Sequence, residues 1–407
     1  MHYVVIRCED HARARDETSS LLEGAKAAYL HHLAQAGAAG VIRAPAAKGR
    51  SRQGDIAIDR FSLHRALVGL GPQDREAAPG LCAAAGANLQ LAPEEIAWCC
   101  ELVTHHDGTI VDPTAGRITT KESAVLIETL NDELGSESQQ WEAGADAHHI
   151  LMLDEPSLGG IDWRSATRAP ELLVGRTWRR SLPRGVVGER LRELMEHASS
   201  LLEEHPINRV RIDLGENPAN LAWLWGGAQA TPQRSFSELT GRAGAVVSNG
   251  LLLRGLSRLL GLDWKTGPAS LGEPALRQVT DALARLVERC DLVEVHLEID
   301  LEEPIERQCA MERIDQLLVK PAAELLSRLG SWRLAVVMDD RRLRGSIPVI
   351  AIGSDLPVRP TPSLTEEALA SSPLAFEDGF AFFAWLTQGE PVHAGPPAKE
   401  GDHGSPR

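Results

Sequence analysis

The chain has 407 residues, of which 43% are hydrophobic and 24% charged, so it can bury a large core and form about two domains. Its formal net charge of -15 argues against nucleic acid or an anionic membrane as a partner, because either would favour a basic surface. A local basic pocket for a phosphate is compatible with this charge.

The sequence predicts a cytoplasmic protein with reduced cysteines. No apolar run reaches transmembrane length, and charged residues follow the first apolar stretch too early for a signal peptide. The six cysteines show no Cys-x-x-Cys spacing, which argues against both a zinc site and a disulfide framework. We therefore expect buried free thiols.

The first predicted elements place carboxylates at the end of a strand. Tyr3–Ile6 is a short apolar strand that leads to Glu9 and Asp10, at the carboxyl end where open α/β sheets bind their ligands. The apolar spacing of Leu21–Gly37 predicts one helix that stops at the glycine. Lys48–Asp59 is predicted to be a polar loop.

The segment with the clearest local sequence signals is predicted to be a hairpin followed by a helix. Ile96–Thr104 and Thr109–Asp112 are predicted strands, and Asp107-Gly108 between them is a tight-turn signal. Thr119 and Glu122 have the spacing of a capping box, in which each side chain bonds the backbone of the other. A helix should therefore begin after Thr119.

The next segment offers candidates for anion binding. His149 lies at the head of an apolar strand, and Glu189–His205 has the spacing of an amphipathic helix. Asn208, Arg209 and Arg211 follow, and arginine is suited to bidentate contacts with carboxylate or phosphate. The alternative is that the two arginines are surface charges.

Strands and helices alternate in the last part of the chain, and Asp339 and Asp340 end one of the strands. The tail 390–407 is rich in proline and glycine and is predicted to be disordered. The predicted elements are strands at Gly244–Ser248, Asp291–Ile299, Val336–Asp340 and Ile347–Gly353, and helices at Leu252–Leu262 and Ala275–Cys290.

Two segments resemble the archaeal-type cofactor-independent phosphoglycerate mutases and their bacterial relatives, in the alkaline phosphatase superfamily. One runs from Ala97-Trp98-Cys99-Cys100 through Asp107-Gly108 to Ala115-Gly116, and the other joins His205–Arg211 to Asn217–Gly226. The resemblance implies an α/β fold with an alkaline-phosphatase-like core sheet flanked by helices, built from residues 1–79 and 239–389. It also implies an inserted α+β substrate domain at 80–238.

The family reaction implied by this resemblance interconverts 3- and 2-phosphoglycerate through a phosphoserine at a two-metal site, with manganese or magnesium. Several of the required positions are changed here. Counting back from Gly69 and Pro72 puts Arg60 at the nucleophilic serine and Phe61 at a metal ligand. Ser62 is the alternative nucleophile, or else the N-cap of this helix.

At most positions that the resemblance aligns with metal ligands, this chain has a residue that cannot bind a metal. The candidate ligands that remain all bind through oxygen. The residual metal candidates are Glu9, Asp10, Asp339 and Asp340, and the substrate-binding candidates are His149, Asn208, Arg209 and Arg211. A two-metal site needs several convergent carboxylates and imidazoles, so any divalent metal should bind weakly or not at all.

We interpret the chain as a phosphoglycerate-mutase-like pseudoenzyme that binds a small phosphorylated carboxylic acid or a protein partner. The alternative is an active metal-dependent mutase or phosphatase with relocated ligands that uses Ser62. Three or more ligand side chains converging at the strand ends would favour the alternative. Phe61 and Leu301 filling that space would favour the pseudoenzyme.

Overall fold

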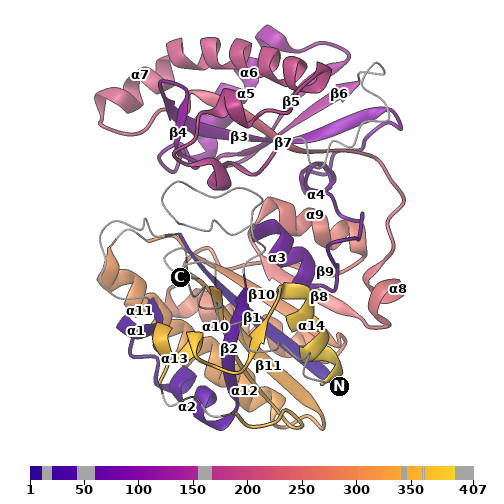
Figure 1. Ribbon diagram of the computed structural model, residues 1–407, viewed down its shortest axis with the longest axis vertical. Coiled ribbons are helices and arrows are strands. Elements are labelled where there is room, and N and C mark those ends of the chain that lie inside the picture. Colours follow the sequence, from indigo (N-terminus) through magenta and orange to yellow (C-terminus); the bar gives the residue numbers. More distant parts are fainter. Residues whose placement is uncertain are drawn as a thin grey trace, which may run out of the picture.

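The computed structural model describes residues 1–11, 21–43, 60–154, 167–301, 303–340, 346–359, 361 and 363–389. Two β-sheets, each with its own helices, are stacked along the long axis of the molecule (Figure 1). The predicted loop Lys48–Asp59 and the tail 390–407 lie outside the described residues. No helix in the described ranges combines the length and the apolar character needed to cross a membrane.

The larger sheet confirms the predicted α/β core. Its described strands have the order β13-β2-β12-β11-β1-β10-β8-β9, in which β1, β8, β10 and β11 are parallel neighbours. β12 is antiparallel to both β11 and β2. The bounds are β1 His2–Asp10, β2 Ala38–Arg43, β8 Gly244–Ser248, β9 Asp263–Thr266, β10 Leu292–Ile299, β11 Trp332–Asp340, β12 Ser346–Gly353 and β13 Ala375–Phe376.

Strand β1 is longer than its apolar residues predicted. It continues through Asp10 because β10 and β11 pair with it on both sides along its whole length. The register puts Glu9 beside Glu298 and Asp339, and Asp10 beside Asp340. Glu9 and Asp10 are therefore the last residues of the strand and do not lie in a loop after it.

Helices cover both faces of this sheet. One face packs against α1 Leu21–Gly24, α2 Ala28–Ala36, α10 Glu273–Leu286, α11 Pro304–Ile314, the π-helical turn η5 Asp315–Val319 and α12 Lys320–Leu326. The other face packs against α3 Arg60–Leu67, α9 Leu251–Leu260 and α14 Gly379–Gln388. Two short helices, α8 Phe236–Thr240 and α13 Glu366–Ala370, complete the described part of this unit.

The single helix predicted at Leu21–Gly37 is wrong, because the structure divides it into α1 and α2. The backbone N–H groups of Tyr29 and Leu30 donate to the carboxylate of Asp315 at 2.9 and 2.8 Å. The N–H of Lys26 donates to Glu312 at 2.9 Å. Carboxylates distant in sequence therefore cap a new helix start, which local periodicity does not reveal.

The second sheet contains the predicted hairpin. The hairpin turn has positive φ at both Asp107 and Gly108, and the capping box between Thr119 and Glu122 is formed as predicted. The His205–Arg211 segment is mainly helical, with His205 as N-cap. The elements are β3 Glu95–His106, β4 Thr109–Asp112, α5 Thr120–Leu134, β5 Gln139–Ala145, β6 His148–Asp154, η3 Pro170–Leu173, η4 Trp178–Ser181, α6 Val186–Glu204, α7 Pro206–Asp213 and β7 Leu221–Gln229.

The two units meet where α4 (Pro79–Gly86) packs on α9. Glycines allow this close approach: a Cβ at Gly255 would lie 1.7 Å from the carbonyl oxygen of Cys82. Arg117 of the second unit also pairs with Asp300, just after β10, at 2.9 Å. The predicted boundaries at 79/80 and 238/239 stay a prediction, although all strands described between Glu95 and Gln229 belong to the second sheet.

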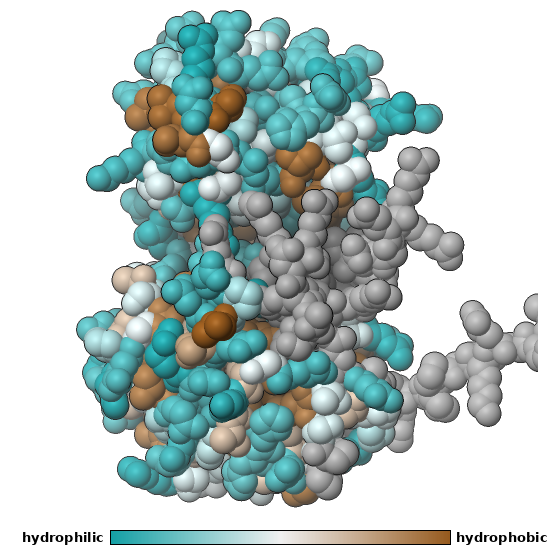
Figure 2. Space-filling view, turned by 90° about the vertical axis from the view of Figure 1, so that its left-hand side faces the viewer, coloured by the Kyte–Doolittle hydropathy of each residue, from teal (hydrophilic) through white to brown (hydrophobic). Residues whose placement is uncertain are grey.

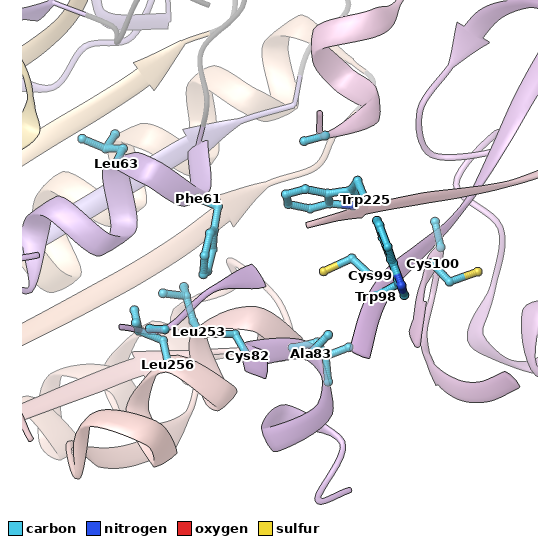
Figure 3. Close-up of a cluster of buried hydrophobic side chains, with 14 of the residues drawn as sticks. Phe61, Leu63, Cys82, Ala83, Trp98, Cys99, Cys100, Trp225, Leu253 and Leu256 are labelled. Carbon is cyan, nitrogen blue, oxygen red and sulfur yellow. The ribbon is translucent and has the colours of Figure 1, made fainter. Parts of the chain in front are cut away.

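The cysteine prediction is confirmed. All six cysteines lie in described ranges and are free thiols, and Cys309 is the one that is partly exposed. Cys82 and Cys99 belong to the apolar cluster that runs from α4 into the second sheet (Figure 3). Burial raises the pKa of the Cys8 thiol to about 12, so this thiol is protonated at neutral pH.

Candidate functional site

The candidate site lies at the carboxyl ends of β1, β10 and β11, on the face of the sheet covered by α3. Val5, Arg7 and Glu9 share this face of β1 because side chains alternate along a strand. The in-register neighbours of these residues on β10 are Glu294, His296 and Glu298. An apolar face therefore becomes polar and charged towards one edge of the sheet.

Arginine side chains neutralise the buried carboxylates of this site. Arg7 Nη2 donates to Asp339 Oδ2 at 2.7 Å, and neither side chain is exposed. On the opposite face of β1, Arg307 of α11 donates from Nη2 to Asp10 Oδ2 at 2.5 Å, and both of these side chains are also buried. Charge-assisted bonds of this kind are short and strong.

Arg60 completes this arrangement from the first turn of α3. Its Nη1 donates to Glu9 Oε1, and its Nε lies 3.6 Å from Asp339 Oδ2. Its Nη2 also lies 3.4 Å from the carbonyl oxygen of Asp10. The resemblance aligns Arg60 with the nucleophilic serine, and Arg60 is a cation. It bonds Glu9, which the resemblance aligns with a metal ligand.

Imidazoles surround the other oxygen of Glu9. His296 Nε2 lies 3.1 Å from Glu9 Oε2, and His64 Nε2 lies 3.9 Å from the same atom. The two rings meet edge to face, with their centroids 4.7 Å apart. His11 Nε2 lies 3.2 Å from Glu9 Oε1.

The second ring nitrogens of His64 and His296 also have partners. His296 Nδ1 lies 3.0 Å from the Ser248 hydroxyl, and His64 Nδ1 lies 3.3 Å from Glu294 Oε1. Glu294 is fully buried at the middle of β10. These contacts fix the orientation of both rings and direct each Nε2 towards Glu9.

Burial and charge act in opposite directions on the ionisable groups of the site. Burial favours the neutral form of Glu9, but Arg60, His11 and His296 hold its pKa well below the usual range. Burial raises the pKa of Glu294 to about 6. Burial, with a contribution from Arg7, lowers the pKa of His64 well below its usual range, so its imidazole is neutral at pH 7.

The predicted metal ligands do not fit a pair of divalent ions. Glu9, Asp10 and Asp339 each bond a buried guanidinium, and two added dications would meet these fixed positive charges. The side chain of Asp340 lies outside the described residues. A different set, Glu9, His64 and His296, has one ligand atom each within 4.8 Å of one another.

Ser62 lies in the first turn of α3, between two residues of this cluster. Arg60 and His64 are one helical turn apart and present the same face of α3 to the site, whereas Ser62 lies between them in sequence on another face. Ser62 is also not the N-cap, since α3 begins at Arg60. Its role as nucleophile stays a prediction.

Phe61 and Leu301 do not fill the space between the carboxylates. Phe61 points towards α4 and α9, where it packs near Cys82 and Leu253 (Figure 3). Leu301 packs against the cluster on the opposite face of the sheet. Three ligand-type side chains do converge, but His64 and His296 were not among those predicted from the sequence.

The predicted substrate residues lie elsewhere, in the second unit. Asn208 donates to the carbonyls of Leu202 and Ala219 at 2.8 Å each and accepts from the N–H of Ala219. Arg211 donates to the carbonyls of Ala115 and Gly116 and pairs with Glu122. Both side chains are therefore used in holding α7 against its neighbours.

Arg209 is exposed on α7, at the end of the second unit that is far from the core sheet (Figure 1). Its neighbours Val210, Ile212 and Leu214 are 57%, 56% and 70% exposed. The face of the molecule in Figure 2, which includes this end, is mostly hydrophilic with an apolar patch on the upper unit. The structure does not bring Arg209 together with Glu9.

A basic hollow is found beside the start of α6. It has a volume of about 520 Å³, and its lining residues are Arg179, Arg180, Leu182, Pro183, Arg184, Gly185, Glu189 and Arg192. Arg179 is held by Glu196 at 2.7 Å and lies over the ring of Trp178. This hollow has the local positive charge that a small phosphorylated acid would need.

The paired histidines of β6 face opposite sides of the strand. His149 is buried, accepts from the N–H of Gly144 at 3.0 Å, and has its pKa lowered by burial to about 3. His148 is half-exposed and pairs with the buried carboxylate of Glu101 at 2.5 Å. The Glu101 charge raises the pKa of His148 to about 9.

We expect the His148–Glu101 pair to give stability that depends on pH. A raised histidine pKa means that its contribution is complete below the unfolded pKa of about 6.5 and is lost as pH rises through about 9. Since His148 is half-exposed, His148→Gln should lower the free energy of unfolding at pH 7 by about 1 kcal/mol. Urea denaturation at pH 7 and pH 10 would measure this difference.

The exposed His197 provides the matched control, and His197→Gln should leave the stability unchanged at both pH values. An equal loss for His148→Gln at pH 7 and pH 10 would contradict the ion-pair explanation.

Comparison with known proteins identifies similar chains. A family model for 2,3-bisphosphoglycerate-independent phosphoglycerate mutase matches residues 34–208. The mutase of that name from Methanosarcina mazei is 32% identical over 295 residues, which cover 69% of this chain and 72% of that protein. The Methanosarcina acetivorans mutase is 33% identical over 247 residues, or 58% of this chain and 61% of that protein.

Solved structures give the same result for the fold. A cofactor-independent phosphoglycerate mutase from Thermoplasma acidophilum has a TM-score of 0.55 at 21% identity, covering 95% of this chain and 99% of that one. A protein from Pyrococcus horikoshii has a TM-score of 0.62 at 18% identity, covering 95% and 96%. The likeness extends over both units of the chain.

Proposed function

Because this chain belongs to the family of 2,3-bisphosphoglycerate-independent phosphoglycerate mutases, we propose that it keeps the framework of the family without its reaction. It is then a mutase-like protein that does not interconvert 3- and 2-phosphoglycerate. The observation that carries this proposal is the bond from Arg60 to Glu9, at the two positions where the family needs a nucleophile and a metal ligand.

Arg60 cannot take the place of a serine nucleophile. The family mechanism needs a hydroxyl that is deprotonated at a metal and attacks phosphorus. A guanidinium stays protonated at any physiological pH and presents only donors. The neighbouring Phe61 has no ligand atom, and its ring is used in the apolar contact between the two units.

The charge balance of the site supports the same proposal. Arg7, Arg60 and Arg307 supply the positive charge that metal ions supply to such carboxylates, and they do so as fixed parts of the chain. Removing one partner of a buried ion pair leaves an uncompensated charge, which costs about 3–5 kcal/mol. Displacement of these guanidinium groups by metals is therefore opposed by the fold.

A small phosphorylated carboxylic acid remains the proposed ligand, and a protein partner is the other proposed binding role. The hollow at the start of α6 supports the binding of a small anion, since four of its lining residues are arginines. Binding there would be independent of turnover at the sheet.

The second candidate function is an active metal-dependent mutase or phosphatase with relocated ligands. It is favoured by two observations, the convergence of Glu9, His64 and His296 and the packing of Phe61 and Leu301 away from the space between the carboxylates. Ser62 would be its nucleophile, although it lies on a different face of α3 and is followed by the buried apolar Leu63.

An enolase-coupled assay with 3-phosphoglycerate distinguishes the two candidates. We expect no turnover above the blank with added manganese, magnesium, cobalt or zinc, whereas the Methanosarcina mazei relative serves as the positive control. Turnover that disappears in Ser62→Ala would overturn the first candidate and establish the second. Turnover that survives in Ser62→Ala would overturn the first candidate and also the assignment of Ser62 as the nucleophile.

A further inference from the structure

We propose that Glu9, His64 and His296 form a mononuclear site for a borderline divalent transition metal such as zinc, distinct from the two-metal arrangement of the family. Two of these three ligands are imidazoles, and neither was among the positions that the resemblance assigns to metals. The site is independent of mutase turnover, so it adds to the proposed function rather than depending on it.

The distances between the ligand atoms match a small coordination sphere. Zinc binds imidazole nitrogen and carboxylate oxygen at about 2.0–2.2 Å, so neighbouring ligand atoms of a tetrahedral site lie about 3.3 Å apart. Glu9 Oε2 lies 3.1 Å from His296 Nε2 and 3.9 Å from His64 Nε2. The His64 ring must move by about 0.6 Å to bring its Nε2 to this distance of about 3.3 Å from Glu9 Oε2, and all three ligand atoms lie within 4.8 Å of one another.

The orientation of both rings is fixed by partners behind them. Ligating histidines in metal sites usually donate their other N–H to a carboxylate or another oxygen, which selects the tautomer. Here Glu294 Oε1 faces His64 Nδ1 at 3.3 Å, and the Ser248 hydroxyl faces His296 Nδ1 at 3.0 Å. With each proton on Nδ1, both Nε2 lone pairs are directed towards Glu9.

Among the described guanidinium groups, only that of Arg7 contacts the Oε2 oxygen of Glu9, and the contact is long. Arg60 and His11 contact Oε1, whereas His64 and His296 approach Oε2. Arg7 lies 3.4 Å from Oε2 but has its short bond, 2.7 Å, to Asp339. Arg7 therefore keeps its main partner when a metal replaces the long contact.

The donor set indicates the class of metal. Two imidazoles and one carboxylate suit zinc, iron, cobalt or nickel, whereas magnesium and manganese prefer sets made of oxygen. Glu9, His64 and His296 are 6%, 6% and 4% exposed, so the bound ion would be enclosed between β1, β10 and α3. It would link two strands to the helix that carries Arg60.

The test measures metal binding on the full chain after treatment with a chelator. We expect about one equivalent of zinc to bind in competition with a chromogenic chelator, and cobalt to give the visible spectrum of a low-coordinate site. His64→Gln and His296→Gln should each weaken zinc binding by at least about 100-fold. Glu294→Gln, which changes the partner of one ligand, should weaken it by about 10- to 100-fold.

His197→Gln, at an exposed histidine, is the matched control and should bind zinc like the unmodified chain. Circular dichroism establishes that each variant is folded, and zinc should raise the melting temperature of the unmodified chain but not of His64→Gln. Zinc binding that is unchanged in both His64→Gln and His296→Gln, or absent from the unmodified folded chain, would overturn the proposal. Neither result would alter the outcome of the enolase-coupled assay.

Discussion

Replacing Arg7 by methionine is expected to lower the free energy of unfolding by about 3–5 kcal/mol, the cost of removing one partner from a buried ion pair. Arg7 and Asp339 are both fully buried and are joined at 2.7 Å. Without Arg7, Asp339 keeps the Nε of Arg60 at 3.6 Å, which is longer than the bond that is lost. Urea denaturation of the variant and of the unmodified chain at pH 7 would measure the loss.

Two variants make this result interpretable. Arg277→Ala removes a pair that is exposed on α10, and it should cost no more than about 0.5 kcal/mol. The double variant Arg7→Met/Asp339→Asn should lose less than the sum of its single changes, because no buried charge is left without a partner. Additive losses, or a loss for Arg7→Met as small as that for Arg277→Ala, would contradict the role assigned to the pair.

Gly255→Ala should also be strongly destabilising, although alanine favours helices. In the middle of α9 the change from glycine to alanine gains about 1 kcal/mol of helix propensity. The new Cβ would lie 1.7 Å from the carbonyl oxygen of Cys82 and 2.5 Å from its carbon, so the backbone of α4 must move. With an overpacking cost of about 3 kcal/mol or more, we expect a net loss of at least about 2 kcal/mol in a thermal or urea unfolding measurement.

Gly330 provides the control for this substitution. A Cβ at Gly330 meets nothing within 4 Å, so Gly330→Ala should change the stability little. Because α4 joins the two units, Gly255→Ala should also make the segment around Pro79 more sensitive to proteolysis. An unchanged stability of Gly255→Ala would mean that α4 can slide on α9 without cost.

Local signals in the sequence predicted the local structure well. The Asp107-Gly108 turn, the strand Thr109–Asp112 and the capping box between Thr119 and Glu122 are present as expected, because each is decided by neighbouring residues. The core strands β1, β8, β10, β11 and β12 were also found from their apolar runs, whereas β2, β9 and β13 were not predicted. These runs identify buried strands without requiring knowledge of their neighbours.

Structural features that depend on contacts between residues far apart in the sequence were not predicted. The break between α1 and α2 is set by Asp315, nearly three hundred residues away in sequence, as its hydrogen bonds to Tyr29 and Leu30 span 286 and 285 positions. The pairing of Arg7 with Asp339 spans 332 positions. No local pattern distinguishes such a partner from any other charged residue.

The sequence contains one pattern that indicates this polar site, namely polar residues that alternate with apolar residues in two strands. Arg7 and Glu9 alternate within an apolar strand, and Glu294, His296 and Glu298 do the same in β10. Period-two polar residues at the ends of two buried strands indicate a shared polar face when the strands are parallel neighbours. Which histidine would meet Glu9 still depended on the register, which the sequence alone does not provide.

The position of β1 between β10 and β11 also has a consequence for synthesis on the ribosome. The second sheet has all of its described strands once Gln229 has been made, so this unit can fold while the chain is still growing. The amino-terminal strand must wait for β10 and β11, and its Tyr3 hydroxyl finds its acceptor, the Thr387 carbonyl, only 384 residues later. During that interval β1 is an apolar strand without neighbours, so it needs protection from incorrect pairing.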